Sequence, residues 1–242
     1  MAQHRRGPAA LLTLTQPRKG ERLADLAAGF GPSAATACRR ARETIRPLAS
    51  RNPELATGLR IAERTGTNTV ILDRTLIPNL RNRIDRPCYS SKHQCHGMHL
   101  QAVTDERGGL LWISGAIPGA VRDTTAARTW QIPQLLAEAS MFASADKGYR
   151  GIDDNLVLTP LWGRGKPAWQ QDHNRLHARL HAPGERTFTQ LKKSLVLDQL
   201  HCDPHRTTEI AKAIQALNHY EAQAGCRVAG RNFPSRPPQI PA

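Results

Sequence analysis

The chain has 242 residues, and its 34 lysines and arginines against 20 acidic residues give a formal net charge of +14. This length allows one domain with a substantial core and a small appendage. No stretch approaches the roughly 20 consecutive apolar residues that span a bilayer, which excludes an ordinary transmembrane helix. The basic excess favours a polyanionic partner, most often a nucleic acid, and a merely basic protein is the alternative.

The cysteines and the N-terminus indicate an intracellular protein. The five cysteines are widely spaced and odd in number, in a chain too large to need disulfide staples. The first residues are basic, but no apolar segment or cleavage site of a signal peptide follows them. We therefore expect reduced thiols in a cytoplasmic protein.

Residues 9–50 have the pattern of a helix-turn-helix. Apolar residues recur at helical spacing over 19–30, Gly31-Pro32 breaks the helix, and Ser33 can cap a second, arginine-rich helix that ends near Leu48. Any basic two-helix hairpin would look similar. Little chain precedes the pair to form a supporting helix, so we expect an incomplete, N-terminally truncated module. The predicted DNA contacts on its second helix are Arg39, Arg40 and Arg46.

Two predicted strands end in a carboxylate. After a helical connection over residues 51–68, the β-branched run 69–72 ends at Asp73. A hairpin over 99–104 and 110–114 and a helix over 123–139 follow. A second apolar run, 140–145, then ends at Asp146. Open α/β sheets place their chemistry beyond the carboxyl ends of the strands.

A third carboxylate, Glu185, follows Pro183-Gly184 and is predicted to open a helix over 185–195. Lys192 lies seven residues further on, on the same helical face. A helix over 207–223 carries an apolar stripe that we interpret as core, and the Pro- and Arg-rich residues 225–242 are predicted to be a disordered tail.

The three acids together indicate divalent cations. Carboxylates without matching cysteines favour hard cations that prefer oxygen, Mg²⁺ or Mn²⁺. Two such ions can stabilise the attacking and leaving oxygens of a phosphoryl transfer, and lysines and arginines outside the site would hold the phosphates of DNA.

Five blocks of the sequence carry a resemblance to a known family. They are ILDRTLIP (71–78), YSSKHQCHGMHLQ (89–101), GAIPGAVRDTTAART (115–129), ADKGYRG (145–151) and HAPGERTFTQLK (181–192). With these blocks the chain resembles the DDE transposases of bacterial insertion sequences, in the Harbinger-like branch.

The resemblance implies an α/β, ribonuclease H-like catalytic domain over residues 69–224, with a mixed central sheet flanked by helices. It also implies strand cleavage at element ends and attack of the freed 3′-OH on target DNA. Asp73, Asp146 and Glu185 match the metal-binding acids, with two ions per site and no organic cofactor, and Lys192 matches a DNA-contacting lysine. The implied partners are terminal inverted repeats, target DNA and a second copy in a synaptic homodimer, in the bacterial cytoplasm at the nucleoid.

Three residues depart from the family pattern. Arg74 replaces the usual glycine after the first acid, Arg122 replaces a histidine, and His181 replaces an arginine. Arg74 and the short N-terminal region favour, as an alternative, a catalytically inactive DNA-binding remnant. Another metal nuclease on the same fold is a further alternative, and the helix-turn-helix upstream argues against it.

Several other residues have two interpretations. Asp123 is either a fourth acid near the metals or the cap of the helix that it opens. Tyr149 and Trp162 could stack on a flipped base, but isolated aromatic residues more often belong to the core. Lys92 and His93 are interpreted as DNA contacts. Two clusters of cysteine and histidine residues suggest zinc, but they lack the paired ligand spacing of a zinc site. These residues are Cys88, His93, Cys95, His96 and His99, with a second cluster at His201, Cys202 and His205.

Overall fold

The computed structural model describes residues 6–79, 86–197 and 206–228. The helices are α1 (Arg6–Lys19), α2 (Leu23–Phe30), α3 (Ala34–Ala49), α4 (Leu55–Arg64), α5 (Asp123–Thr129), α6 (Ile132–Glu138), α7 (Ala168–Lys192) and α8 (Thr207–Val228). The strands are β1 (Thr69–Pro78), β2 (Tyr89–Ser90), β3 (Cys95–Thr104), β4 (Leu110–Ile113), β5 (Ile117–Pro118), β6 (Phe142–Ala145) and β7 (Val157–Leu158). Short 3₁₀ turns are η2 (Arg86–Cys88), η3 (Lys147–Tyr149) and η4 (Leu195–Leu197).

A mixed sheet in the order β2-β3-β1-β6-β7 forms the centre of the molecule, with β4 and β5 also paired to β3. β1 pairs with β3 in antiparallel fashion and with β6 in parallel, and β6 pairs with β7 in parallel. The predicted hairpin is formed by β3 and β4. The sheet and its flanking helices confirm the predicted α/β class.

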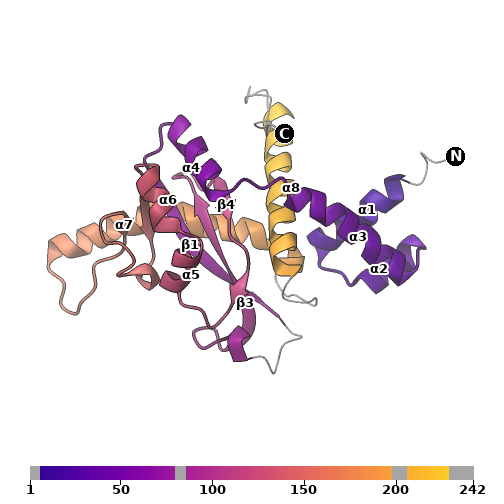
Figure 1. The fold of residues 1–242 in the computed structure, drawn as a ribbon, viewed down its shortest axis with the longest axis horizontal. Helices are drawn as coiled ribbons and strands as arrows, with labels where there is room; N and C mark the ends of the chain where they lie inside the picture. Colours follow the sequence, from indigo (N-terminus) through magenta and orange to yellow (C-terminus); the bar gives the residue numbers. More distant parts are fainter. Residues whose placement is uncertain (1–5, 80–85, 198–205, 229–242) are drawn as a thin grey trace.

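Alternation of side chains along β1 separates two cores, and α7 crosses the face of the sheet opposite to α5 and α6 (Figure 1). Val70 and Leu72 belong to the core under α4, α5 and α6. Ile77 belongs to the core under α7 and α8, on the other face. Because side chains alternate across a strand, Asp73 lies on the same side of β1 as Ile77 and faces α7.

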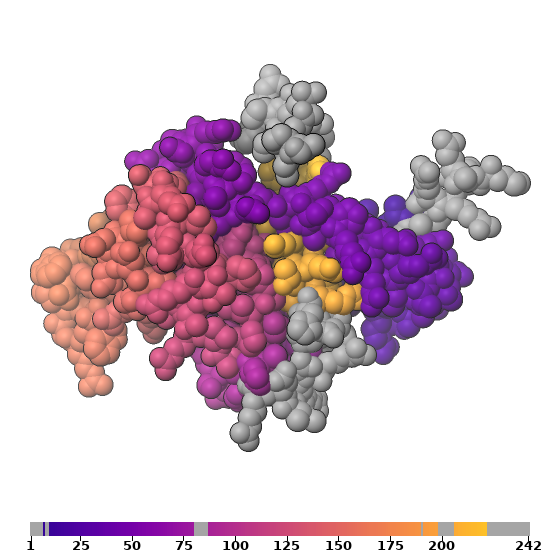
Figure 2. All heavy atoms as spheres, in the orientation of Figure 1, coloured from indigo at the N-terminus to yellow at the C-terminus, as the bar shows by residue number. Residues whose placement is uncertain are grey.

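The three N-terminal helices have a small core of their own, built from Leu12, Leu26, Ala27 and Ala37. Ser33 caps α3 as predicted, since its side chain accepts a hydrogen bond from the Thr36 amide. α3 also packs along α8, and its Ile45 enters the core beneath the sheet. The N-terminal helices and the outer end of α7 lie at opposite ends of the molecule (Figures 1 and 2).

Several predicted boundaries were wrong. β1 continues to Pro78, so Asp73 lies inside the strand and not at its tip. The strand is longer because residues 71–78 pair with 97–104 of β3, where Leu76 and Ile77 are buried. α7 begins at Ala168, so Glu185 lies late in this helix and does not open it.

Two further helices differ from the prediction. The helix predicted over 123–139 is divided into α5 and α6, because Gln131 adopts a left-handed backbone conformation between them. α8 continues through residues 225–228, the predicted start of the disordered tail. The rest of that tail, and the histidine and cysteine cluster at 201–205, lie outside the described residues. Within the described part of the chain, no helix has the length and apolar character needed to cross a membrane.

Candidate active site

The parallel pairing of β1 with β6 brings two of the predicted acids together. The register places Leu72 opposite Ala145, so the next residues, Asp73 and Asp146, are neighbours at one edge of this strand pair. Adjacent strands lie about 4.8 Å apart. Both side chains line one cavity of about 330 Å³. The sequence predicted both aspartates, and the sheet register brings them together.

Helix α7 crosses β1 close to these aspartates. A Cβ atom at Gly184 would lie 2.6 Å from Cγ2 of Ile71, so only glycine permits this approach. One turn earlier, Nε2 of His181 lies 4.0 Å from Oδ2 of Asp73. Glu185 follows on the same face of the helix as His181, with its side chain exposed.

The charges of the other two predicted acids act on Asp73. Its pKa is raised above 3.8, chiefly because burial disfavours the charged carboxylate. The Arg74 amide, which donates to Asp73 at 2.7 Å, and His181 oppose this rise. The negative charges of Asp146 and Glu185 add to it. A cation between the acids would relieve this repulsion.

Asp123 lies in the same site, buried at the first residue of α5. A Cβ atom at Gly148 would meet the carboxylates of both Asp123 and Asp146, at 2.0 and 2.9 Å, so the two side chains converge there. Arg74 forms an ion pair with Asp123 in which both side chains are largely buried. Burial nevertheless raises the pKa of Asp123 to about 6, because it outweighs the opposing effect of Arg74.

Asp123 was predicted to act either as a fourth acid or as a helix cap. The N-cap position of α5 is held by Arg122, and Asp123 is the first residue of the helix proper. Asp123 lies beside Asp146, since both carboxylates meet at Gly148, and it also pairs with Arg74. The sequence flagged Arg74 as a departure, but it did not indicate this partner.

Basic side chains surround the cavity. Lys92, His93 and Lys192, three of the predicted DNA contacts, all line it. The pKa of His93 is lowered by partial burial, and further by the charges of Lys92, Arg74 and Lys192. The cavity therefore combines carboxylates at its base with cations around them, which suits a phosphate chain held next to a metal site.

Two of the three carboxylates are arranged as ligands of a divalent cation. Asp73 and Asp146 are adjacent, share a cavity and carry mutually repelling charges, and such oxygen donors fit Mg²⁺ or Mn²⁺. As the side chains stand, however, no three histidine, cysteine, aspartate or glutamate residues of the described chain are close enough to hold one ion. The two aspartates fit a divalent cation, and Glu185 would have to turn inward to join them.

A buried hydrogen-bond network beneath the site was missed from the sequence. The side-chain amide of Gln101, on β3, donates to the Asp123 carbonyl at 3.2 Å and to the Tyr149 hydroxyl at 3.1 Å. Tyr149 is fully buried, and burial raises its pKa well above 10. It therefore packs in the core beneath the acids, as the simpler interpretation of this residue predicted.

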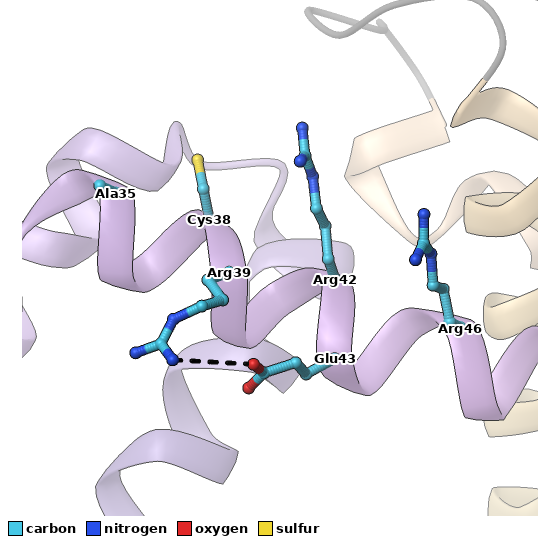
Figure 3. Close-up of a pocket in the computed structure, with 6 residues that line it drawn as sticks. All are labelled: Ala35, Cys38, Arg39, Arg42, Glu43 and Arg46. Atoms are coloured by element: carbon cyan, nitrogen blue, oxygen red, sulfur yellow. Dashed lines mark ion pairs between the residues drawn. The ribbon is translucent and has the colours of Figure 1, made fainter.

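The arginines of α3 form a second basic surface, beside a hollow of about 580 Å³ (Figure 3). Arg42 and Arg46 point to the same side as Cys38, whereas Arg39 turns away toward Glu43. Arg39 pairs with Glu43 at 4.0 Å, and Arg46 pairs with Glu209 of α8 at 3.5 Å. Arg40 is half-buried. Arg42, absent from the predicted contacts, is exposed on this helix.

The cysteine and histidine residues that suggested zinc have other surroundings. Sγ of Cys88 is buried 3.9 Å from Sδ of Met98. His99 is buried with Nε2 2.9 Å from the Gly119 carbonyl oxygen, and burial lowers its pKa to about 4. Cys38, Cys88 and Cys95 form no disulfide bond within the described part of the chain.

Comparisons with known proteins place the chain in a family. No curated protein sequence matches it. Among solved structures it is similar to a pre-cleavage Mos1 transpososome, with 15% identity over 93% of this chain and 79% of that one and a TM-score of 0.25. It is also similar to the Mos1 strand transfer complex, with 14% identity over 94% and 79% and a TM-score of 0.25.

The family described as DDE superfamily endonuclease matches residues 72–218, which is more than half of the chain. The matched region contains the mixed sheet and the three acids, and it agrees with the predicted ribonuclease H-like α/β fold. The chain therefore belongs to the DDE superfamily endonuclease family.

Proposed function

We propose that the protein is a DDE transposase of a bacterial insertion sequence, in the Harbinger-like branch, which cleaves DNA at element ends and joins the freed 3′-OH to target DNA. Family membership supports a transposase-like nuclease. The observation that carries the proposal is the adjacency of Asp73 and Asp146 on parallel strands, in one cavity with basic walls.

In this proposal Asp73, Asp146 and Glu185 hold Mg²⁺ or Mn²⁺, two ions per site. When bound, the ions supply positive charge that stabilises an in-line displacement at phosphorus. Asp73 and Asp146 are positioned by backbone pairing and need little movement. Glu185 reaches the site by a side-chain rotation, because α7 is already fixed against β1 at Gly184.

The basic residues have separate tasks in the proposed reaction. Lys92, His93 and Lys192 line the cavity and would hold the phosphates that flank the cleaved bond. The helices α1 to α3, the proposed helix-turn-helix, would bind the terminal inverted repeat with the arginines of α3. Two copies of the chain would bring the two element ends together in a synaptic homodimer.

A nicking experiment tests the proposal. The protein is incubated with a labelled duplex that carries the terminal repeat of its element, in Mg²⁺, Mn²⁺ or EDTA. We expect nicking at the element end only with metal, and we expect Asp146→Asn to lose it by at least about a hundredfold, since the lost ligand stabilises the displacement. The matched control is Asp172→Asn, which removes an exposed carboxylate that pairs with Arg175 and should leave the rate unchanged.

The reaction products distinguish the proposed transposase from other metal-dependent nucleases. Joining of the cut end to a second duplex distinguishes a transposase from a nuclease that only cleaves. Metal-dependent nicking that is equally fast in Asp146→Asn would show that the acid group is not the catalytic site.

A second candidate function is a DNA-binding remnant without catalysis. The observation that favours it is the charge arrangement around the acids. Arg74 pairs with Asp123, so a guanidinium of the chain itself already neutralises part of the site, and His181 lies against Asp73. Binding of the terminal repeat without nicking in either metal would select this candidate.

The Arg74→Gly variant measures how strongly this cation opposes metal binding. Removing the guanidinium takes away a positive charge and frees the Asp123 carboxylate, and both changes favour a divalent ion. We expect Mn²⁺ to bind about tenfold more tightly, the ratio that a removed repulsion of about 1.4 kcal/mol gives. Titration of free Mn²⁺ by electron paramagnetic resonance measures this directly.

The control for Arg74→Gly is Arg122→Ala, since Arg122 is an exposed arginine next to Asp123. It should change the affinity for Mn²⁺ by less than twofold, because its charge is screened by solvent. Equal Mn²⁺ affinity of Arg74→Gly and the wild type would show that Arg74 does not compete with the metal.

A further inference from the structure

Trp162 is the most exposed of the large apolar side chains in the described chain. It lies in the segment between β7 and α7, and 75% of its surface is exposed. The interpretation of Trp162 as a core residue is therefore wrong, in contrast to Tyr149, which is fully buried. An exposed indole offers a large flat apolar face to a ligand.

Contacts from two neighbouring residues fix the position of the indole. The guanidinium of Arg150 lies 5.6 Å from the centre of the Trp162 ring and covers one of its faces. The large exposed fraction leaves the other face open. Next to it, the side chain of Asn174 accepts from the Leu161 amide at 2.8 Å and donates to the Leu161 carbonyl at 3.0 Å. These two bonds fix the backbone immediately before the tryptophan.

The segment that follows Trp162 carries basic side chains. Arg164 and Lys166 follow Trp162, separated by Gly163 and Gly165, which both adopt positive φ values. The nearby acidic residue Asp172 is paired with Arg175. A flat aromatic face among unpaired cations suits a ligand that has both a planar ring and negative charge, and this combination argues against an apolar protein partner or a neutral ligand.

The position of the segment connects it to the acid site. β7 pairs in parallel with β6, with Leu158 opposite Ser144, so both strands end at the same edge of the sheet. Asp146 comes two residues after Ser144, and Trp162 comes four residues after Leu158. Arg150, which covers the indole, follows Asp146 by four residues. The loop stands out from the body at the end of the molecule formed by α7 (Figure 1).

We propose that Trp162, backed by Arg150, is a stacking platform for an unpaired base of single-stranded DNA, and that Arg164 and Lys166 hold the phosphates of the same strand. A base would stack on the open face of the indole, so that it completes a sandwich of guanidinium, indole and base. An aromatic ring accepts any base in this way, and the binding is therefore tolerant of sequence. The proposal rests on the proposed function only for the direction of the strand, which would lead to the acid site.

Binding of a single-stranded oligonucleotide of arbitrary sequence, in EDTA, tests the proposal without metal or an element end. The probe is a fluorescein-labelled dodecamer of thymidine, followed by fluorescence anisotropy. We expect Trp162→Ala to weaken binding about tenfold, the order of one lost base–aromatic stack. Trp162→Phe should retain most of the affinity, because a phenyl ring still offers a face.

The salt dependence of oligonucleotide binding separates the contribution of charge from that of stacking. Arg150→Ala should weaken binding, because it removes the guanidinium that covers one face of the indole. Trp162→Ala should leave the slope of log K against log salt concentration unchanged, because stacking releases no counterions. Leu180→Ala, which truncates an exposed side chain of α7 outside this segment, is the matched control and should bind like the wild type.

A second readout observes the base itself. A dodecamer with a single 2-aminopurine should lose fluorescence on binding to the wild type and not on binding to Trp162→Ala, since stacking on the indole quenches the probe. Unchanged affinity of Trp162→Ala, or equal quenching by that variant, would overturn the proposal. Stronger quenching of tryptophan emission by anionic lipid vesicles than by the oligonucleotide would also overturn it. The nicking experiment with Asp146→Asn is independent of all these outcomes.

Discussion

At the level of single residues, the site is dominated by competition between burial and charge. Asp123 is almost fully buried and is paired with Arg74, yet its pKa is raised to about 6. The attraction of one guanidinium therefore does not offset the loss of water around the carboxylate, as is common for buried ion pairs. At neutral pH the carboxylate is nonetheless ionised, and the ion pair is present.

This balance predicts how stability depends on pH. The folded chain holds the Asp123 proton more tightly than the unfolded chain, in which the pKa is near 3.8. The resulting stabilisation is complete below pH 3.8 and is lost as the pH rises through about 6. Relative to Asp123→Asn, which does not titrate, the free energy of unfolding of the wild type should fall across this window and become level above it.

Urea unfolding at half-unit intervals between pH 3.5 and 8 measures this difference. Asp25→Asn, on the exposed surface of α2, is the control for a general effect of the substitution. A wild-type stability that rises across the same window, relative to Asp123→Asn, would show that Arg74 outweighs burial.

At the level of elements, the crossing of α7 over β1 decides whether Glu185 can reach the aspartates. The crossing is close because Gly184 has no side chain to meet Ile71. His177 and His181, on the same face of α7, stack with ring centres 5.9 Å apart. His177 also lies 3.2 Å from the Ser144 hydroxyl on β6. The face of α7 toward the sheet is therefore fixed at several points before Glu185.

Gly184→Ala should disturb this crossing. The new Cβ would lie 2.6 Å from Ile71 Cγ2, and such overpacking costs about 1–3 kcal/mol of unfolding free energy. Chemical denaturation measures the loss. Gly29→Ala, in α2, is the matched control because a Cβ there meets nothing within 4 Å, and it should stabilise the protein by up to about 1 kcal/mol.

The cause of the Gly184→Ala effect can be tested with a second substitution. Ile71→Ala removes the clashing Cγ2 atom, so the double variant should be less destabilised than the sum of the two single changes. Strict additivity would assign the loss to the helix alone and not to its contact with β1.

At the level of the whole molecule, α8 links the N-terminal helices to the sheet. Its Ile210 and Ile214 share a core with Ile45 of α3 and with Leu100 of β3. The side-chain amide of Asn52 also bonds the Lys212 carbonyl, and the Thr208 hydroxyl accepts from the Ala116 amide at 2.8 Å. The proposed end-binding helices and the acid site are thus parts of one packed body.

Ile45→Ala tests this coupling. Truncating a buried isoleucine should lower the free energy of unfolding by about 2–5 kcal/mol. The loss should appear in a single transition, with the same midpoint by far-ultraviolet circular dichroism and by tryptophan fluorescence. Leu26→Ala, in the core of the N-terminal helices, should shift the same single transition to lower stability. Two separate transitions in the wild type would show that the N-terminal helices fold independently.

The sequence by itself determined the features that local patterns encode. The apolar segments 99–104 and 110–114 predicted the hairpin of β3 and β4, Ser33 predicted the start of α3, and the resemblance to a known family implied the α/β class. The motifs around Asp73 and Asp146 predicted the acid group and the family. These properties depend on neighbours in the chain, so they can be inferred without knowing the packing.

Only the tertiary structure decided the properties that depend on contacts between distant segments. β1 extends past Asp73 because β3 pairs with it, and α7 begins well before Glu185 because its inner face packs on β1 and β6. The pairing of Arg74 with Asp123 and the exposure of Trp162 likewise follow from which segments meet. Charge and burial act through space, and a side chain's partners are fixed only when the sheet register and the helix crossing are fixed.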